Sequence, residues 1–288
     1  MTAHGTGTRT RTRGRRREPA RALTAWEALP AWAHAAAGAV VLLAVWWAFA
    51  AAHTARGAVP APDRVLARCL GNLGDPTYWH SVGRTGSEAA QGYLWGNVLA
   101  LALAAAVVLA PWLDGPITQF GVIISCVPLT AVAPLIVLMS ATSSRMVSAA
   151  LAAMLVFFTT LTGALVGLRA ADPAALDVVG VYGGGRWKQL TKVRVMAAVP
   201  DVLNALKLAA PAAFVGAILG EFFLSGVDSG LGIMLMAAQV HSRPEPLWAL
   251  ALLSAAVAGA AYGAVGLLER VVAPWATGVA RPGERGAR

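Results

Sequence analysis

The sequence contains little charge and almost no cysteine. Charged residues make up 13% of its 288 residues, and the two cysteines are Cys69, in a predicted connection, and Cys126, in the middle of a predicted apolar segment. We therefore expect no disulfide between them. No Cys-x-x-Cys motif occurs, and the five histidines are scattered without the spacing of metal ligands. These absences exclude a disulfide framework, and we predict no metal site.

The residue patterns of two enzyme classes are also missing. The sequence has no Gly-x-x-x-x-Gly-Lys-Ser/Thr phosphate loop, so we do not expect the chain to hydrolyse ATP by that chemistry. An enzyme acting inside a membrane would need a catalytic pair at helical spacing, such as His with Glu or two Asp, and no such pair is present. We predict no catalytic residue and no cofactor bound by this chain.

What the sequence does have is long apolar runs, with 57% hydrophobic residues and a mean hydropathy of +0.62. About 20 helical residues cross a hydrocarbon core of about 30 Å. Six runs reach that length: 31–52, 86–110, 117–139, 147–168, 202–224 and 247–268. They predict an all-α, polytopic membrane protein with one transmembrane domain over residues 31–275. Residues 1–30 and 276–288 are predicted to be tails outside the membrane, the first of them disordered.

Basic residues are distributed unequally between the two sets of connections. Sixteen lie in the N-terminal tail, in residues 169–200 and after the last run, whereas the alternate connections hold six arginines. Basic flanks stay in the cytoplasm, so we expect both termini and residues 169–200 to be cytoplasmic. The Arg-rich tail could bind nucleic acid, act as a secretion signal or hold the terminus inside near anionic lipid. The apolar run after it is too long for a cleaved signal; we therefore favour retention and expect no nucleic-acid partner.

The connection at residues 169–200 is long, basic and rich in glycine. Gly183, Gly184 and Gly185 predict a tight turn, after which Arg186, Lys188, Lys192 and Arg194 are spaced along a predicted short helix. Val199–Pro200 is expected to end the connection where the next span begins. Cytoplasmic connections of polytopic proteins are usually short, so this one is predicted to be a docking site for another protein.

Proline and acidic residues mark a few positions within the spans. Pro128 and Pro134 in the third run, and Pro211 in the fifth, each remove a backbone hydrogen bond; they are either packing kinks or the signs of a helix that lines a path. Lys207 can extend its amine to the cytoplasmic interface. Glu221 lies 20 residues beyond Asp201, about 30 Å along a helix, and is therefore placed at the outer mouth. Its carboxylate belongs either to a structural pair or to a gate.

Several segments resemble permease subunits of bacterial ATP-binding-cassette importers, in the branch that takes up sulfonates, taurine, nitrate and related compounds. The family's cytoplasmic motif is Glu-Ala-Ala, three residues, Gly and later Leu-Pro; here it is matched by Asp177–Val178–Val179, Gly183 and Val199–Pro200. Further matching segments, between residues 79 and 275, are Trp79–His80, Gly83–Arg84, Val127–Leu135, Gly185–Trp187 and Leu219–Gly232. The sequence departs from the pattern at Val178, Val179 and Met196, and its acid is shortened to Asp177.

The resemblance implies a type I permease-like fold in the plasma membrane of a bacterium. A separate cytoplasmic ATP-binding subunit, which carries ATP and magnesium, is expected to grip two short helices, with Trp187 and Leu190 as an apolar anchor and the basic residues around it. The implied docking residues are Asp177, Gly183, Gly185, Arg186, Trp187, Leu190, Lys192 and Pro200. The candidates for the pore and its gate are Pro128, Pro134, Pro211, Glu221, Gly230 and Gly232.

Further partners implied by the resemblance are an extracytoplasmic substrate-binding protein and a second permease copy, with a homodimer expected within membrane lipid. The alternative hypothesis is an ion-coupled secondary transporter. Such carriers often show repeated halves and acids or broken helices at matching depths. No repeat is evident in this sequence, and the third and fourth runs contain no acidic residue.

Overall fold

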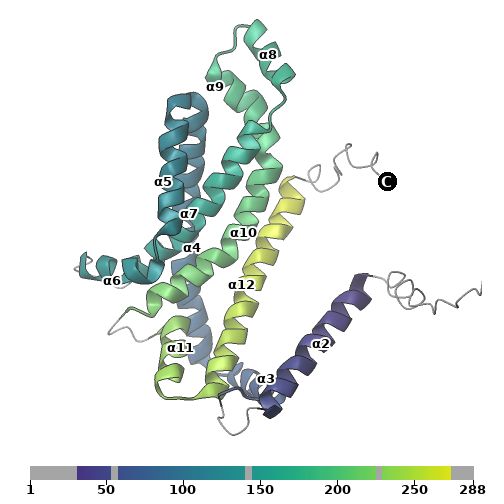
Figure 1. Ribbon diagram of the computed structural model, residues 1–288, viewed down its shortest axis with the longest axis vertical. Coiled ribbons are helices and arrows are strands. Elements are labelled where there is room, and N and C mark those ends of the chain that lie inside the picture. Colours follow the sequence, from purple (N-terminus) through teal and green to yellow (C-terminus); the bar gives the residue numbers. More distant parts are fainter. Residues whose placement is uncertain (1–30, 53–57, 140–144, 225–228, 274–288) are drawn as a thin grey trace, which may run out of the picture.

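The computed structural model describes residues 31–52, 58–139, 145–224 and 229–273, and within these ranges all regular elements are helices (Figure 1). In this part of the chain, five helices are long and apolar enough to cross a membrane, and the bent pair α5–α6 makes a sixth if it is counted as one span. The prediction of an all-α polytopic protein is confirmed. The predicted tails, residues 1–30 and 276–288, lie outside the described residues.

The elements are α2 (Ala31–Ala52), α3 (Pro62–Asn72), α4 (Pro76–Leu109), η2 (Pro111–Leu113), α5 (Asp114–Cys126), α6 (Leu129–Met139), α7 (Arg145–Arg169), α8 (Pro173–Val181), α9 (Arg186–Gln189), η3 (Leu190–Arg194), α10 (Val195–Glu221), α11 (Leu231–Val240) and α12 (Pro244–Val272). Helices α8 and α9 form one end of the molecule, and α11 and α3 lie at the other (Figure 1).

The second span is longer than predicted, because α4 begins at Pro76 rather than at residue 86. Asp75 is its N-cap: the carboxylate accepts a hydrogen bond of 2.9 Å from the amide of Thr77, and Pro76 occupies the first helical position, where its missing N–H costs nothing. The hydrogen bond from the Thr77 amide lowers the pKa of the Asp75 carboxyl. This cap lets the helix extend beyond the apolar run that predicted it.

The third span is broken. Helices α5 and α6 meet at an angle of 95°, and between them Val127 has an extended backbone with ψ of 124°. A proline disfavours the helical conformation of the residue before it, so Pro128 accounts for the break. Pro134 lies within α6 without ending that helix.

The fifth span begins earlier than predicted. Pro200 lies inside α10, which starts at Val195 and continues directly from α9 and η3; the expectation that Val199–Pro200 ends the connection is therefore wrong. Tertiary packing holds this turn in place, since Ala198 is buried where Gly167 of α7 approaches it. Pro211 is also inside α10, and the hydroxyl of Tyr93 donates to the nearby Leu206 carbonyl at 3.1 Å.

Helices α4, α7 and α10 form the centre of the bundle and pack through small residues. A Cβ placed on Gly92 or Gly96 of α4 would lie within 3 Å of α7, and the same holds for Gly216 and Gly220 of α10. Small residues allow helices in lipid to approach closely. Gly92 and Gly96 therefore serve the packing of α4 on α7, whereas Gly86, earlier in α4, has no atom within 4 Å of a built Cβ.

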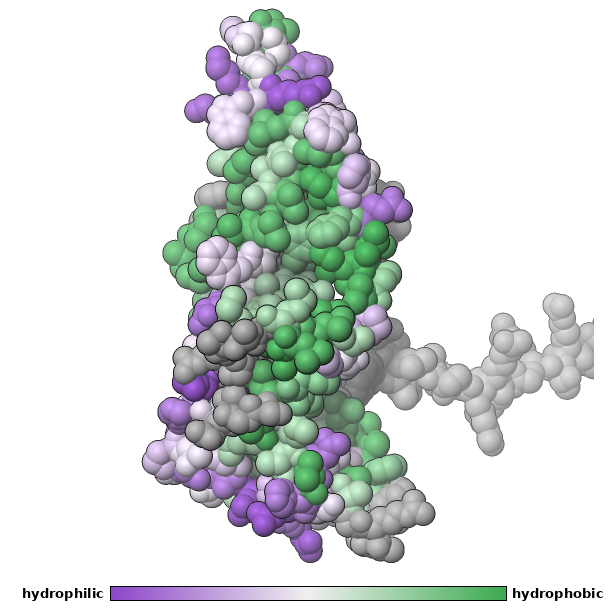
Figure 2. Space-filling view, turned by 90° about the vertical axis from the view of Figure 1, so that its left-hand side faces the viewer, coloured by the Kyte–Doolittle hydropathy of each residue, from purple (hydrophilic) through white to green (hydrophobic). Residues whose placement is uncertain are grey.

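Helices α2 and α12 lie at the edge of this bundle and keep most of their apolar surface exposed. They contact one another through Trp46 and Trp248, whose stacked rings have centroids 5.3 Å apart. Figure 2 shows a broad apolar band between polar groups at the two ends of the molecule, as expected of a chain that crosses a bilayer.

Candidate functional site

The connection between α7 and α10 projects from the bundle as two short helices, α8 and α9, joined by a tight turn (Figure 1). The amide of Gly184 donates to the Val179 carbonyl at 2.8 Å, and the amide of Gly183 donates to the Gly180 carbonyl at 2.9 Å. This pair of bonds is a Schellman motif, which needs a left-handed residue after the helix. Gly183 supplies it with φ of +72°, so the predicted tight turn is confirmed.

The three glycines of the turn have different roles. Gly183 has space for a side chain but an unfavourable backbone for one, whereas a Cβ on Gly184 would lie 2.4 Å from Val179 Cγ1. Gly185 has a negative φ of −75° and no atom within 4 Å of a built Cβ. All three glycines were predicted to form the turn, and Gly183 and Gly185 to belong to the docking surface; within the turn, the steric requirement for glycine lies at Gly184 and not at Gly185. The unbroken run of three glycines did not distinguish them.

The apolar surface of this helix pair differs from the predicted one. Trp187 is 64% exposed, as a docking residue requires, but Leu190 is only 4% exposed and packs in the chain's own core with Leu168 and Val107. Leu190 therefore cannot anchor a partner without leaving that core. Val181 and Tyr182, at 86% and 85% exposed, extend the surface beside Trp187 and were not singled out from the sequence.

Two of the basic residues bind within the chain. Arg186 donates to the Leu109 carbonyl at 3.2 Å, and Arg194 donates to the Leu168 carbonyl at 3.0 Å. Arginine commonly satisfies the free carbonyls at the C-terminal end of a helix, and here the two side chains fasten α9 and η3 to the ends of α4 and α7. Lys188 and Lys192 are exposed and remain at the surface of the hairpin, as does Asp177.

Glu221, at the far end of α10, is almost fully buried, with 1% of its surface exposed. Its Oε1 accepts a hydrogen bond of 2.6 Å from the hydroxyl of Thr85, and its Oε2 accepts one of 2.5 Å from the amide of Gly232. The amide of Leu231 in turn donates to the Thr85 hydroxyl at 2.9 Å. One carboxylate thus joins α10, α4 and the start of α11.

Glycine is required on the α11 side of this junction. A Cβ on Gly230 or Gly232 would lie within 3 Å of the Glu221 side chain. The structure therefore brings together Glu221, Gly230 and Gly232, three of the predicted pore or gate residues. Thr85 and Leu231 complete the network and were missed; a hydroxyl among small residues early in α4 was the available signal for Thr85.

The predicted proline positions do not join this cluster. Pro128 and Pro134 are exposed on the bent pair α5–α6, and Pro211 is half-buried within α10. The buried side of α6 is formed by Ala133, which packs with Val147 and Leu151 of α7. Pro128 and Pro134 therefore shape the broken span rather than contribute to the carboxylate network.

Lys207, predicted to extend its amine to the cytoplasmic interface, pairs within the bundle instead. Its ammonium lies 2.6 Å from the carboxylate of Glu269 on α12 and 5.6 Å from the ring centroid of Tyr262. Both charged side chains are mostly shielded, so the pair joins α10 to α12. Among the described residues, no group of three or more His, Cys, Asp or Glu side chains is placed to hold a metal ion.

Comparison with known proteins gives one family. Residues 96–273, more than half of the chain, match the family described as binding-protein-dependent transport system inner membrane component. The chain is 27% identical over 220 residues to the riboflavin transport system permease protein RibX of Chloroflexus aurantiacus, covering 75% of this chain and 80% of that protein.

Two further relatives are also named permease proteins. A probable ABC transporter permease protein of Haemophilus influenzae is 27% identical over 184 residues, which cover 63% of this chain and 71% of the relative. The putative aliphatic sulfonates transport permease protein SsuC of Bacillus subtilis is 31% identical over 151 residues, or 52% of this chain and 53% of that protein. All three relatives are named transport permeases.

Proposed function

Because the chain belongs to the family of binding-protein-dependent transport system inner membrane components, the permeases of ATP-binding-cassette importers, we propose that it forms the membrane path for a small polar or anionic organic solute. An extracytoplasmic binding protein delivers the solute, and a separate ATP-binding subunit drives its passage. The chain itself is a multi-pass inner membrane transport subunit. The family match does not favour an ion-coupled secondary transporter.

The projecting hairpin of α8 and α9 carries this proposal. Val181, Tyr182 and Trp187 expose a large apolar surface at the tip of the molecule. Lys188 and Asp177 are exposed on the same hairpin, and Lys192 is exposed on the adjoining η3. Aromatic side chains within a charged rim are the usual energetic centre of a protein interface. Their place beyond the apolar band supports docking of a water-soluble subunit, here the ATPase, on residues 169–200.

The names of the relatives support the proposed class of solute. One relative is named for riboflavin and another for aliphatic sulfonates, both of which are small organic compounds with polar groups. We take the solute of this chain to be of that general kind, with selectivity residing mainly in the binding protein.

The surface of the protein supports a proposal for its orientation and its assembly. The start of α2 and the end of α12 point to the side that carries α8 and α9 (Figure 1), which supports cytoplasmic termini. The exposed apolar faces of α2 and α12 would be covered by lipid and by a second copy of the permease. The preference for closed two-fold assemblies supports a homodimer.

The test is co-purification of the chain with the ATP-binding subunit encoded beside it. We expect the purified chain alone to hydrolyse no ATP, and the complex to hydrolyse ATP faster when loaded binding protein is added. ATP turnover by the isolated, contaminant-free chain would refute the division of labour. Failure of every neighbouring ATP-binding subunit to bind it would refute the docking site.

A further inference from the structure

Helix α5 packs on the bundle along one face, where Ile117 and Ile124 are half-buried against the core. Gly121 is its buried residue, and a Cβ there would lie 3.0 Å from Leu161 of α7. Beside it, Phe120 packs edge-on against Phe157, with ring centroids 6.4 Å apart. Phe120 and Ile123, on the outer face of α5, are more than half exposed, so a tilt of α5 on α7 would be opposed mainly by the contacts of Gly121, Ile117 and Ile124.

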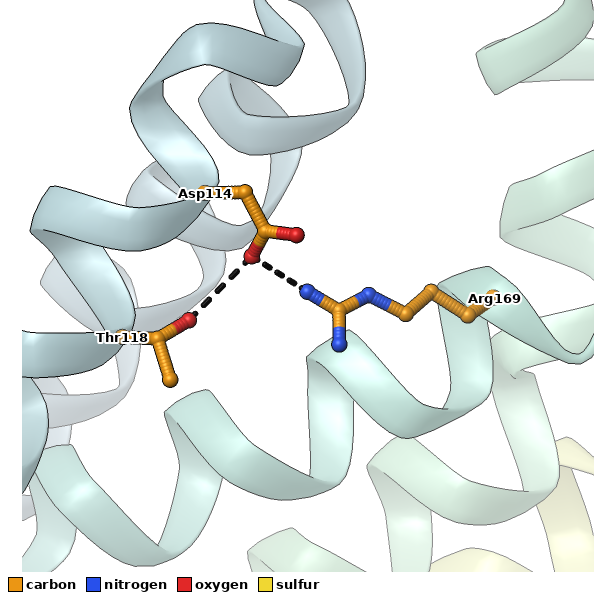
Figure 3. A network of polar contacts seen from close by, with 3 residues as sticks. All are labelled: Asp114, Thr118 and Arg169. Carbon is orange, nitrogen blue, oxygen red and sulfur yellow. Dashed lines mark hydrogen bonds and ion pairs between the residues drawn. The ribbon is translucent and has the colours of Figure 1, made fainter.

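A polar tie joins the ends of these two helices. Figure 3 shows the Asp114 carboxylate, at the start of α5, between the Arg169 guanidinium and the Thr118 hydroxyl, which lies one turn further along α5. Thr118 donates to Asp114 Oδ1 at 3.2 Å, and the same oxygen accepts from Arg169. An acid in the first turn of one helix and a base in the last turn of another also suit the two helix dipoles.

This ion pair is suited to being broken and remade. The side chains of Arg169 and Asp114 are 50% and 45% exposed, and they border an open cavity of about 450 Å³ that is also lined by Thr118 and Gln119. Exposed ion pairs contribute little to stability. The fold therefore does not depend on this contact, and breaking or forming it would shift the start of α5 relative to α7 at little cost in stability.

The position of Arg169 connects the pair to the hairpin. Arg169 is the last residue of α7, and only residues 170–172 separate it from Pro173, where α8 begins. This short connection is held at two points. Ala171 is buried, and Asp172 caps α8 by accepting a hydrogen bond of 2.9 Å from the Ala174 amide. A displacement of α8 would therefore move the Arg169 backbone.

The other end of α5 is the break in the third span. Val127 is extended, so no continuous helix joins α5 to α6, and α6 is fixed to α7 through Ala133. A tilt of α5 would accordingly change the bend at Val127–Pro128. We propose that Asp114 and Arg169 are positioning residues that transmit nucleotide-dependent movement of residues 169–200 to the broken span α5–α6, an inference that rests on the proposed function.

The protein contains its own reporter for this movement. Cys126, the last residue of α5, lies at the break in the span and is exposed in the isolated chain, so in the membrane its rate of modification depends on how far water and reagent reach that break. Replacing Cys69 with serine leaves Cys126 as the single thiol of the chain. The experiment measures the rate at which N-ethylmaleimide modifies Cys126 in the complex with the ATP-binding subunit, with and without a magnesium-bound non-hydrolysable ATP analogue. Mass spectrometry of the permease chain keeps the partner's thiols out of the measurement.

We expect the nucleotide to change the rate at Cys126 in the parent complex. Asp114→Asn and Arg169→Gln should each lose that change, whereas Asp114→Glu and Arg169→Lys, which preserve the charges, should retain it. Arg64→Gln is the matched control, since Arg64 forms another exposed ion pair, with Glu245 at 3.9 Å, near the opposite end of the molecule. It should respond as the parent does.

The inference is overturned if the neutral variants respond like the charge-preserving ones, or if the parent shows no nucleotide-dependent change. Co-purification of the ATP-binding subunit is measured in every variant. If all variants bind it and the neutral variants keep the nucleotide-dependent change at Cys126, the docking proposal stands and the proposed role of Asp114 and Arg169 is wrong. If the parent chain does not bind the ATP-binding subunit, the proposed function is wrong, and so is the role of Asp114 and Arg169 that rests on it.

Discussion

Gly183 and Gly184 form the same turn for different physical reasons. Gly183 has a left-handed backbone, and Gly184 lies against Val179 too closely for any side chain. Their neighbour Gly185 meets neither condition. Single substitutions can therefore test the two effects separately: backbone strain at Gly183 and steric overlap at Gly184. A substitution of Gly185 should cause neither.

The first prediction concerns this turn. Gly184→Ala should reduce co-purification of the ATP-binding subunit while membrane insertion persists, because relieving the overlap with Val179 distorts the hairpin at a cost of about 1–3 kcal/mol. Gly183→Val should also reduce binding and abolish transport, since a left-handed backbone costs other residues about 1–2 kcal/mol. Gly185→Ala is the control. Equal binding by all three variants would contradict the assignment.

The second prediction concerns Glu221. In Glu221→Gln the Gly232 amide still needs an oxygen acceptor, so the new NH₂ group faces Thr85, and the Thr85 hydroxyl proton loses its acceptor. A buried polar group left without a partner costs about 1–3 kcal/mol. We expect a lower Tm in detergent, impaired uptake and altered stimulation of ATP hydrolysis by loaded binding protein, with the ATP-binding subunit still bound.

Glu245→Gln is the control for Glu221→Gln, because Glu245 is exposed and its one ion pair with Arg64 is long. Its Tm should match that of the parent protein. A Glu221→Gln protein that melts and transports normally would show that the junction of α4, α10 and α11 does not need the charge. A change in solute preference alone would assign Glu221 to selectivity instead.

At the scale of elements, α9 and η3 have one exposed face and one face buried in the core of the bundle. Trp187 is exposed, and Leu190, three residues later, is buried with Leu168. Between them the backbone passes into a π-helical turn at Leu190–Arg194, and such turns often occur at functional sites. Residues three positions apart in this segment therefore differ in role: Leu190 stabilises the fold, and Trp187 is free to take the proposed docking role.

The third prediction separates these two roles. Trp187→Ala should weaken binding of the ATP-binding subunit without changing the Tm of the isolated permease, since the side chain packs against little of its own chain. Leu190→Ala should lower the Tm, because removing a buried leucine typically costs about 2–5 kcal/mol. Thermal melting of each purified permease and pull-down of the partner measure both effects. The reverse pattern would place the docking surface elsewhere.

The boundaries of the spans show where hydropathy is informative. The run at residues 31–52 coincides with α2, because that helix has little packing to alter its ends. The run at residues 86–110 missed the first turns of α4, which depend on the Asp75 cap. Hydropathy also predicted the third span as one continuous run, whereas Pro128 divides it into α5 and α6. The prolines had indicated a kink there, but not a bend of 95°.

At the scale of the whole molecule, the two candidate functional features lie at opposite ends. The hairpin of α8 and α9 lies at one end, and the Glu221 junction with α11 lies at the other (Figure 1). The central helices α4, α7 and α10 connect them through close, glycine-mediated contacts. Densely packed helices are hardly compressible and transmit strain. A displacement at one end of these three helices can therefore reach the other end.

The fourth prediction tests which end faces the cytoplasm. Single cysteines at Arg186 and Ser229, in a background lacking Cys69 and Cys126, should be labelled from opposite sides. A membrane-impermeant thiol reagent applied to intact cells should reach position 229 and not position 186, because the positive-inside rule keeps the basic connection in the cytoplasm. Labelling of position 186 from outside, with lysed cells as the reference, would overturn the orientation.

The sequence by itself determined the class of this protein. Apolar runs long enough to span a bilayer led to an all-α membrane protein, and the glycines of the basic connection led to its tight turn; its cytoplasmic side and its docking role stay predictions. These features can be deduced because they depend on length, composition and local backbone preference. The missing phosphate loop likewise indicated that energy is supplied by another chain.

Only the tertiary structure decided which residues of each pattern are used for what. In the sequence, Leu190 and Trp187 are equivalent as apolar anchors, but the structure buries Leu190. Arg186 is one of several basic residues in the sequence, whereas in the structure its guanidinium donates to the Leu109 carbonyl. Glu221 meets Thr85, 136 residues earlier in the chain. Contacts over such separations depend on helix packing as a whole, and no local pattern in the sequence specifies them.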